Sequence, residues 1–429
     1  MIHSFSPLVP LQRGGPEKLF TQKVSSSALG YAITFLLLIG LICSGILFIS
    51  SANKRLELNY QLKEHLILDN YMSLLAGANS EKEGTRRIYH SAGDTTEITL
   101  KPWGAFKVVI AKTWHNNRTI TKSALIGSGL ENNLPVLYLP GNNQALKLIG
   151  DTKNEGTAYL PERGLDRGYI AGKNYLNDKL LYGEQKKSEK YLPKIKELYQ
   201  NLSLENFIKG TKKIEGISND TLFSFDQETS LYSSIEAITL TNSIKGNIII
   251  HSFDSIFVNS TAILENVILI APKVRFATGF KGSVQVIAHQ KIVCEENVRL
   301  TYPSTLVLNE IKMNLDQENN SIVLHENVQV RGGILLISQA SNFRKPIRLK
   351  MDTKSLVAGI VYNQGETEIK GKMIGHLYTQ SFNLKAGGGE YSNHLLDALI
   401  SSEKLPEEFI IPNWMEENKV GKSKIMSCF

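Results

Sequence analysis

Residues Gly246–Leu300 read GNIIIHSFDSIFVNSTAILEN, VILIAPKVRFATGFKGS and VQVIAHQKIVCEENVRL, and they carry an irregular repeat. An apolar strand begins at Ile248, Val267 and Val284, at spacings of nineteen and seventeen residues. Three short strands in a turn of about eighteen residues predict a parallel β-helix, because each coil buries its inward side chains only by stacking on its neighbours. Further apolar marks in the three turns are the pairs Ile256/Val258, Val274/Phe276 and Ile292/Val293 and the single residues Ile263, Phe280 and Val298.

The repeat continues toward the C-terminus. It resumes after residues 314–320, so we predict a parallel β-helix of at least five turns over residues 230–385. In this pattern the sequence resembles right-handed parallel β-helix proteins and, more distantly, the polymer-forming bactofilins; the resemblance implies a mainly β fold and no particular activity. Residues 386–429 are expected to form a capping helix at Tyr391–Ser402, reached through a flexible Gly387–Gly389 link, and a tail. The cap would cover strand edges at the end of the solenoid.

An uncharged apolar segment lies near the N-terminus. Residues 28–49 read ALGYAITFLLLIGLICSGILFI, and about 20 apolar residues are enough to cross the ~30 Å hydrocarbon core of a bilayer. We predict a tail at residues 1–27, a single transmembrane helix in contact with membrane lipid at 28–50, and a helical continuation at 51–80. Basic residues flank the segment on both sides, so they do not decide its orientation. We expect the body in the periplasm, anchored in the inner (cell) membrane by a single pass.

Residues 85–172 alternate apolar and polar side chains and predict a small strand-rich domain with a sheet near the helix. A long membrane helix that continues into an amphipathic segment and a sheet resembles the plan of type IV pilins and pseudopilins, over about residues 20–125. The processing motif of that family places a Glu five residues after the cut, but Gly30 is followed by Tyr31–Phe35 without an acid. The resemblance therefore lies in architecture, and it implies a minor pilin-like or secretion-apparatus component.

The basic excess is concentrated in a Lys-rich segment, residues 173–229. Between Lys173 and Lys213 there are ten Lys and five acidic residues, a balance of +5 out of the chain's +7. We predict a partly helical insertion with helices at 192–199 and 204–208. It is either a solvated surface or a patch for acidic partners such as lipid headgroups or anionic glycans. The absence of aromatic stacking platforms argues against nucleic acid. The candidate interaction surface consists of Lys186, Lys187, Lys190, Lys194 and Lys196.

No pattern in the sequence predicts a catalytic, cofactor-binding or metal site. A glycosidase needs two carboxylates roughly 5–9 Å apart. One and two turns beyond Asp254, however, the repeat places Lys273 and then Gln290 or Lys291. We therefore expect a protein that is not an enzyme: a membrane-anchored envelope scaffold or assembly protein with protein partners and no cofactor. Two alternatives stay open, a carbohydrate-binding or polysaccharide-cleaving β-helix with a glycan surface, and a membrane-associated cytoskeletal polymer with a cytosolic body.

Overall fold

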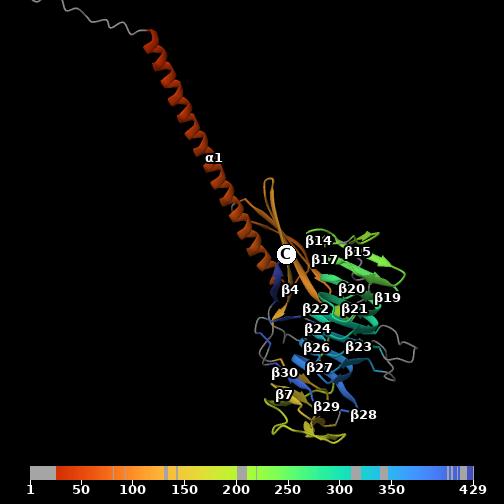
Figure 1. Cartoon of the computed structure of the whole chain (residues 1–429). Helices are drawn as coiled ribbons and strands as arrows, with labels where there is room; N and C mark the ends of the chain where they lie inside the picture. Colours follow the sequence, from red (N-terminus) through yellow and green to blue (C-terminus); the bar gives the residue numbers. More distant parts are fainter. Residues whose placement is uncertain are drawn as a thin grey trace, which may run out of the picture. The chain divides into compact units, whose positions relative to one another are not determined.

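The structure is a computed structural model, and the chain divides into two compact units, residues 1–65 and 66–429. One helix, α1 (Ser26–Ala78), begins in the first unit and ends in the second (Figure 1). The second unit is mainly β. The described residues are 26–80, 82–91, 93–129, 134–141, 144–200, 210–218, 220–310, 320–338, 346–402, 405–406, 409–412, 414–415 and 423–428.

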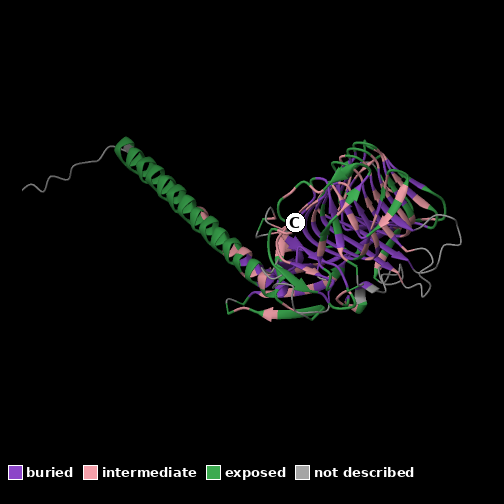
Figure 2. Ribbon diagram, turned by 90° about the horizontal axis from the view of Figure 1, so that it is seen from below, coloured by how far each residue is buried: buried purple, intermediate pink, exposed green. Residues whose placement is uncertain are grey.

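The part of α1 in the first unit is apolar and exposed. Every side chain from Ser27 to Ser51 is exposed, including Leu36 at 69% and Leu41 at 75% (Figure 2). The helix is long and apolar enough to cross a membrane. Residues 28–50 alone extend about 35 Å at 1.5 Å per residue. The prediction of one long apolar N-terminal helix is confirmed.

The end of α1 packs on an antiparallel sheet within the second unit. The sheet order is β1-β2-β3-β4, with the tail strands β31 and β32 both paired with β4. The face toward the helix is apolar because alternate residues of β2 and β3 point to it. The prediction of a sheet near the helix is confirmed. The strand bounds are β1 (Gly84–Tyr89), β2 (Thr95–Trp103), β3 (Phe106–His115), β4 (Arg118–Gly129), β31 (Ile410–Ile411) and β32 (Ser423–Cys428).

Two residues of α1 fit this sheet closely. Asn70 is fully buried, and its Nδ2 donates to the carbonyls of Ala111 (2.7 Å) and Ile120 (3.2 Å) and to the Thr113 hydroxyl (3.0 Å). At Gly77 a Cβ atom would collide with the side chain of Val109, so glycine allows the helix to approach the sheet. The end of α1 is therefore held by specific contacts as well as by apolar burial.

Most of the other strands belong to one closed, mainly parallel sheet. Its inner face carries the largest core cluster, which is buried because successive strands bring apolar side chains into register (Figure 2). The strands are β5 (Leu137–Tyr138), β7 (Lys153–Glu155), β8 (Ala158–Leu160), β12 (Gln185–Lys187), β13 (Thr211–Ile214), β14 (Thr221–Phe223), β15 (Thr229–Ser234), β16 (Ile238–Leu240), β17 (Ser243–Gly246), β18 (Ile248–Ser252), β19 (Ser255–Val258), β20 (Ile263–Phe276), β21 (Lys281–Cys294), β22 (Arg299–Glu310), β23 (Ser321–Leu324), β24 (Gln329–Ser338), β25 (Arg348–Met351), β26 (Leu356–Ile369), β27 (Lys372–Ala386), β28 (Gly389–Ser392) and β30 (Leu399–Ser401).

The register of this sheet follows the repeat in the sequence. Ile256 pairs with Val274, Val274 with Ile292, and Ile292 with Ile322, so one inward column runs through β19, β20, β21 and β23. Val267 pairs with Val284, as the spacing predicts. In two turns the buried residue is one position C-terminal to the predicted one. Cys294 is buried instead of Val293, and Leu264 is buried instead of Ile263.

The Lys-rich segment contributes strands to the sheet, and its described residues also include one short helix, α2 (Glu197–Gln200). β12 pairs with β8, while β13 and β14 pair with β15 and β17. In the predicted 192–199 range the helix begins only at Glu197, the first residue of α2. There Ile195 forms a bridge with Met415, and the Lys196 amide donates to the Trp414 carbonyl. The second predicted helix, at 204–208, lies outside the described residues.

The predicted capping helix at Tyr391–Ser402 is wrong. The range contains β28, β29 (His394–Leu396) and β30. Asn393 and Asp397 have positive φ values of 55° and 53°, which interrupt a helix. The predicted flexible link is a turn at Gly387–Gly388 that joins β27 to antiparallel β28.

The closed sheet continues beyond β27. β27 pairs with β5, β5 with β8, and β8 with β12, so segments from before the repeat extend the far end of the sheet. A smaller sheet beside them joins β29 to β6 (Leu146–Ile149) and β9 (Leu165–Arg167), and β10 (Tyr169–Ile170) pairs with β11 (Lys173–Asn174). Figure 1 shows the labelled strands in order from β14 and β15 to β7 and β29.

A second core joins the antiparallel sheet to the outer face of the closed sheet. Trp103, Phe106 and Leu125 from the antiparallel sheet belong to one buried cluster with Ile268 and Val307 from the closed sheet. Gln285 of β21 links the two sheets at the turn between β2 and β3. Its Oε1 accepts from the Ala105 amide (2.7 Å), and its Nε2 donates to the Trp103 carbonyl (3.1 Å). The closed sheet therefore supports the antiparallel sheet, which we call the helix-binding sheet because the end of α1 packs on it.

Candidate interaction site

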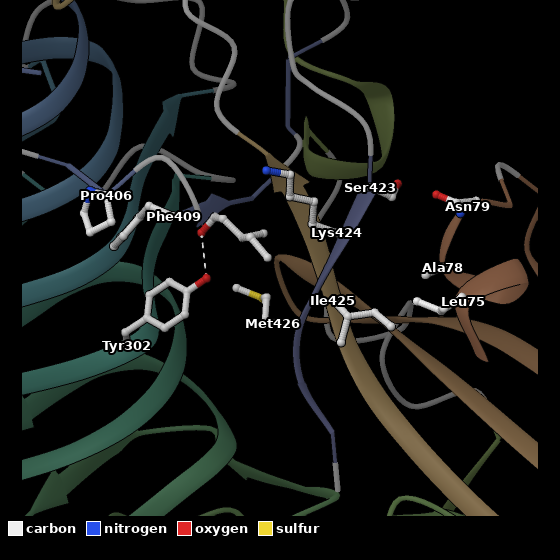
Figure 3. Close-up of a pocket in the computed structure, with 11 residues that line it drawn as sticks. Leu75, Ala78, Asn79, Tyr302, Pro406, Phe409, Ser423, Lys424, Ile425 and Met426 are labelled. Carbon is white, nitrogen blue, oxygen red and sulfur yellow. Dashed lines mark hydrogen bonds between the residues drawn. The ribbon is translucent and has the colours of Figure 1, made fainter. Parts of the chain in front are cut away.

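A groove of about 640 Å³ lies where the end of α1, the tail strands and the closed sheet meet within the second unit (Figure 3). Most of its wall is apolar, and its polar groups come from Asn79, Ser423, Lys424 and the Tyr302 hydroxyl. Figure 3 shows Tyr302 and Phe409 on one side and the end of α1 on the other. The lining residues are Leu75, Ala78, Asn79, Tyr302, Pro406, Phe409, Ile410, Ser423, Lys424, Ile425 and Met426.

Tyr302 fixes one wall of the groove. Its hydroxyl donates to the Ile410 carbonyl (3.1 Å), and its ring packs against Phe409 with centroids 4.9 Å apart. Burial raises the pKa of the Tyr302 phenol well above its usual range, so this group remains a neutral donor. The groove can accept an apolar side chain, and its described lining contains no nucleophile beside a general base.

The sequence did not predict this groove, because its parts come from three distant segments. The sequence predicted only a tail after the capping helix, yet β31 and β32 lie there and pair with β4. The tail strand gives no clear signal either, because SKIMSC at residues 423–428 does not alternate polar with apolar side chains. Tyr302 and Leu75 have no signature that would relate one to the other.

The five predicted lysines take different places. Lys186 and Lys187 lie on β12 and pair with Glu184 (3.4 Å) and Glu162 (3.6 Å). Lys190 lies over the ring of Tyr191, with its Nζ 5.5 Å from the centroid, and Lys194 is exposed. Lys196 is partly buried, and its pKa is lowered by that burial and by neighbouring Lys107. Lys196 therefore lies near β3, and a single surface formed by all five lysines stays a prediction.

Two of these lysines mark the end of the closed sheet. Among the described strands, β12 pairs only with β8, and at the other end β13 pairs only with β15. β12 and β13 each carry an adjacent Lys pair, Lys186–Lys187 and Lys212–Lys213, and all four side chains are exposed; β14 and β16, which also have a single partner strand, carry none. Lysines on open edges are a common protection against edge-to-edge pairing.

Carboxylates do meet on one face of the closed sheet, at a smaller groove of about 300 Å³. Glu366 accepts from Arg348 Nε (2.8 Å) and from Asn383 Nδ2 (2.9 Å), and Glu368 pairs with Lys370 (2.7 Å). Both carboxylates are therefore already engaged with a basic side chain. The column predicted from Asp254 is shifted by one residue, because Lys273 pairs with Ser255.

A Ser-His-Asp arrangement is present where α1 meets the sheet. Ser73 Oγ lies 3.4 Å from His90 Nε2, and His90 Nδ1 lies 3.6 Å from Asp69. The shorter contact of His90 Nε2 is with the Thr96 hydroxyl (2.8 Å), and the Ser73 side chain is buried. These groups act as a polar contact that holds the helix. In the described ranges, no three His, Cys, Asp or Glu side chains are grouped to hold a metal ion.

Comparisons with known proteins add one weak likeness. No protein-family model and no curated protein matches the sequence. Among solved structures, the competence-associated pilin ComZ from Thermus thermophilus aligns with 81% of this chain and 86% of its own, at 8% identity and a TM-score of 0.18. At this TM-score and identity the likeness carries no argument about fold or function.

Proposed function

We propose that this protein is a non-catalytic, membrane-anchored scaffold, with α1 as its single membrane span. The observation that carries the proposal is the division of one continuous helix. Its first half presents apolar side chains without any protein cover, and its last turns are buried on the antiparallel sheet. A fully exposed apolar helix of this length is stable in lipid and poorly soluble in water.

We also interpret the closed parallel sheet as a β-solenoid. Successive positions in one column are 18, 18 and 30 residues apart, from Ile256 through Val274 and Ile292 to Ile322. A chain that returns to the same face at such intervals coils around one core, so each coil is stabilised by its neighbours. Such a body is suited to presenting long strand faces to partners.

The side of the membrane on which the body lies is also part of the proposal. We assign the body to the extracytoplasmic side of the inner (cell) membrane, in a pilus-like or secretion assembly. The support is the order of helix and antiparallel sheet together with the absence of a cysteine-based redox or metal site among the described residues. The Lys pairs on β12 and β13 favour a scaffold over a polymer that grows through these strand edges.

Membrane fractionation tests the anchor. The full chain is expected to stay in the membrane pellet after alkaline carbonate, because its apolar helix is held by lipid. Leu37→Arg/Leu41→Arg places two charges at the centre of the span and is expected to release the protein, since each charge costs about 3 kcal/mol there. The matched control, Leu37→Ile/Leu41→Ile, keeps the apolar surface and should stay in the pellet. Extraction of the unaltered chain by carbonate would contradict the proposal.

Cross-linking tests the assembly role. Residues 52–65 of α1 are mostly exposed and more polar than the span, so they are available to a partner helix. A photo-crosslinker at Leu58 is expected to capture another membrane-anchored protein in native membranes, whereas the same group at Lys112 on β3 should not. Capture at neither position would leave the anchor intact and would contradict the assembly role.

A further inference from the structure

One outer face of the closed sheet carries a row of basic side chains, the basic stripe: Lys281, Arg299, Arg331 and Lys372. They lie on β21, β22, β24 and β27, and all four are exposed. The residues that alternate with them, including Leu300, Val330 and Met373, are fully buried on the inner side. The four cations therefore point outward from one face.

The register fixes their order. Lys281 pairs with Arg299, and Arg299 pairs with Gln329. Arg331 follows Gln329 by two residues on the same strand, so it lies on the same side. Gln329 pairs with Leu356, which pairs with Lys372. At about 4.8 Å between strands, the charges lie about 5, 10 and 19 Å from Lys281 along the sheet.

The acidic side chains near this row are engaged with other cations. Glu265 pairs with Lys245 (2.9 Å), and Glu326 pairs with Lys354 (2.9 Å). Glu296, in the adjacent turn, is exposed. Within the described part of the chain, no ion pair joins any of the four cations to an acid.

Such a row has an energetic cost. Like charges directly opposite each other on neighbouring strands are destabilising, and Lys281 and Arg299 are direct partners. A ligand with regularly spaced negative charges would remove this repulsion and would contact several strands at once. Arg299 and Arg331 can each hold a carboxylate with two parallel hydrogen bonds.

We propose that the basic stripe binds an acidic polysaccharide, with carboxylates on Lys281, Arg299 and Arg331 and sugar hydroxyls beside Gln329. Single-stranded nucleic acid fits less well because aromatic platforms for bases are missing: the intervening positions Gln329, Leu356 and Ala358 are not aromatic. The site is independent of the membrane anchor, since all its residues lie in the second unit.

Binding of polygalacturonate to the full chain in detergent tests the proposal, at 50 and 200 mM salt, with neutral dextran as the control polymer. Lys281→Gln/Arg299→Gln is expected to weaken binding about tenfold at low salt, the sum of two partly exposed charge contacts. The matched variant Lys112→Gln/Lys273→Gln removes two exposed lysines from other faces and should change affinity less than twofold. Unbound, the stripe variant should melt no lower than the unaltered protein, because a like-charge pair is removed.

Three results would overturn the proposal. The first is no binding of polygalacturonate at 50 mM salt. The second is an equal loss in both double variants, which would assign the attraction to net charge. The third is tighter binding of a single-stranded oligonucleotide of equal charge, which would assign the stripe to nucleic acid. A failed carbonate test of the anchor would leave the binding result unaffected.

Discussion

The closed sheet and the helix-binding sheet are stabilised in different ways. In the closed sheet, apolar columns repeat from strand to strand, so each residue is one of many similar contacts. At the end of α1, a few unlike groups, above all Asn70 and Gly77, determine the fit. The first kind of region gains stability from length, and the second gains specificity from single residues. Substitutions should therefore act differently in the two regions.

The largest effect is expected in the closed sheet. Phe276 is fully buried, so Phe276→Ala should lower the free energy of unfolding by about 3–5 kcal/mol through lost burial and a cavity. Phe253, 61% exposed, is the matched control, and Phe253→Ala should change stability by less than about 0.5 kcal/mol. Urea unfolding followed by circular dichroism measures both. Similar losses in the two variants would contradict the assigned core.

The next effect is expected at the helix contact. Asn70→Leu keeps the size of the side chain but leaves the Ala111 and Ile120 carbonyls without their donor, at a cost of about 2–3 kcal/mol. Hydrogen exchange should show faster opening of β3 and β4, with the closed sheet unchanged. Gln61→Leu, on the exposed part of the same helix, is the control. Faster exchange throughout the second unit would mean that the two sheets unfold together.

A smaller, pH-dependent effect should come from the closed sheet. His376 is buried with its Nδ1 donating to the Pro135 carbonyl (2.9 Å). Burial lowers the pKa of His376, although this hydrogen bond opposes the shift. The unfolded chain therefore binds the proton first, and stability is lost as the pH falls from about 6.5 toward the folded pKa.

Replacement of this histidine separates it from other titrating groups. His376→Gln should lose less stability than the unaltered protein between pH 7 and pH 5, as measured by thermal melts. His394→Gln, at a partly exposed position, serves as the control. An unchanged pH dependence in His376→Gln would show that this histidine does not titrate as its burial implies.

The smallest effect on stability is expected at the sheet end. Lys186→Thr/Lys187→Thr should change the free energy of unfolding by less than about 0.5 kcal/mol. It should nevertheless promote self-association, because the open edge of β12 loses its charges. Light scattering on the full chain in detergent would show larger particles, and Lys112→Thr/Lys273→Thr should not produce them. Equal particle sizes would assign these lysines another role.

The two regions were also unequally predictable from sequence. The columns through Ile256 and Val267 could be predicted because their spacing is nearly regular and their pairing is between neighbours in the chain. The extension of the sheet by β5 could not, since His376 and Pro135 are 241 residues apart and nothing in either segment indicates the other. The expected capping helix failed because Asn393 and Asp397 look like ordinary polar helix residues until their φ values are known. The basic stripe was missed because its four members stand apart in the sequence.

The most direct test of the account is a cysteine scan along α1 in native membranes, in a background with Cys43, Cys294 and Cys428 replaced by Ser. A charged maleimide needs water to react with a thiol. Leu36→Cys, Leu41→Cys and Leu47→Cys are therefore expected to stay unlabelled until the membrane is dissolved, and Leu58→Cys should react at once. Equal labelling of all four positions in intact membranes would contradict a membrane span at residues 28–50.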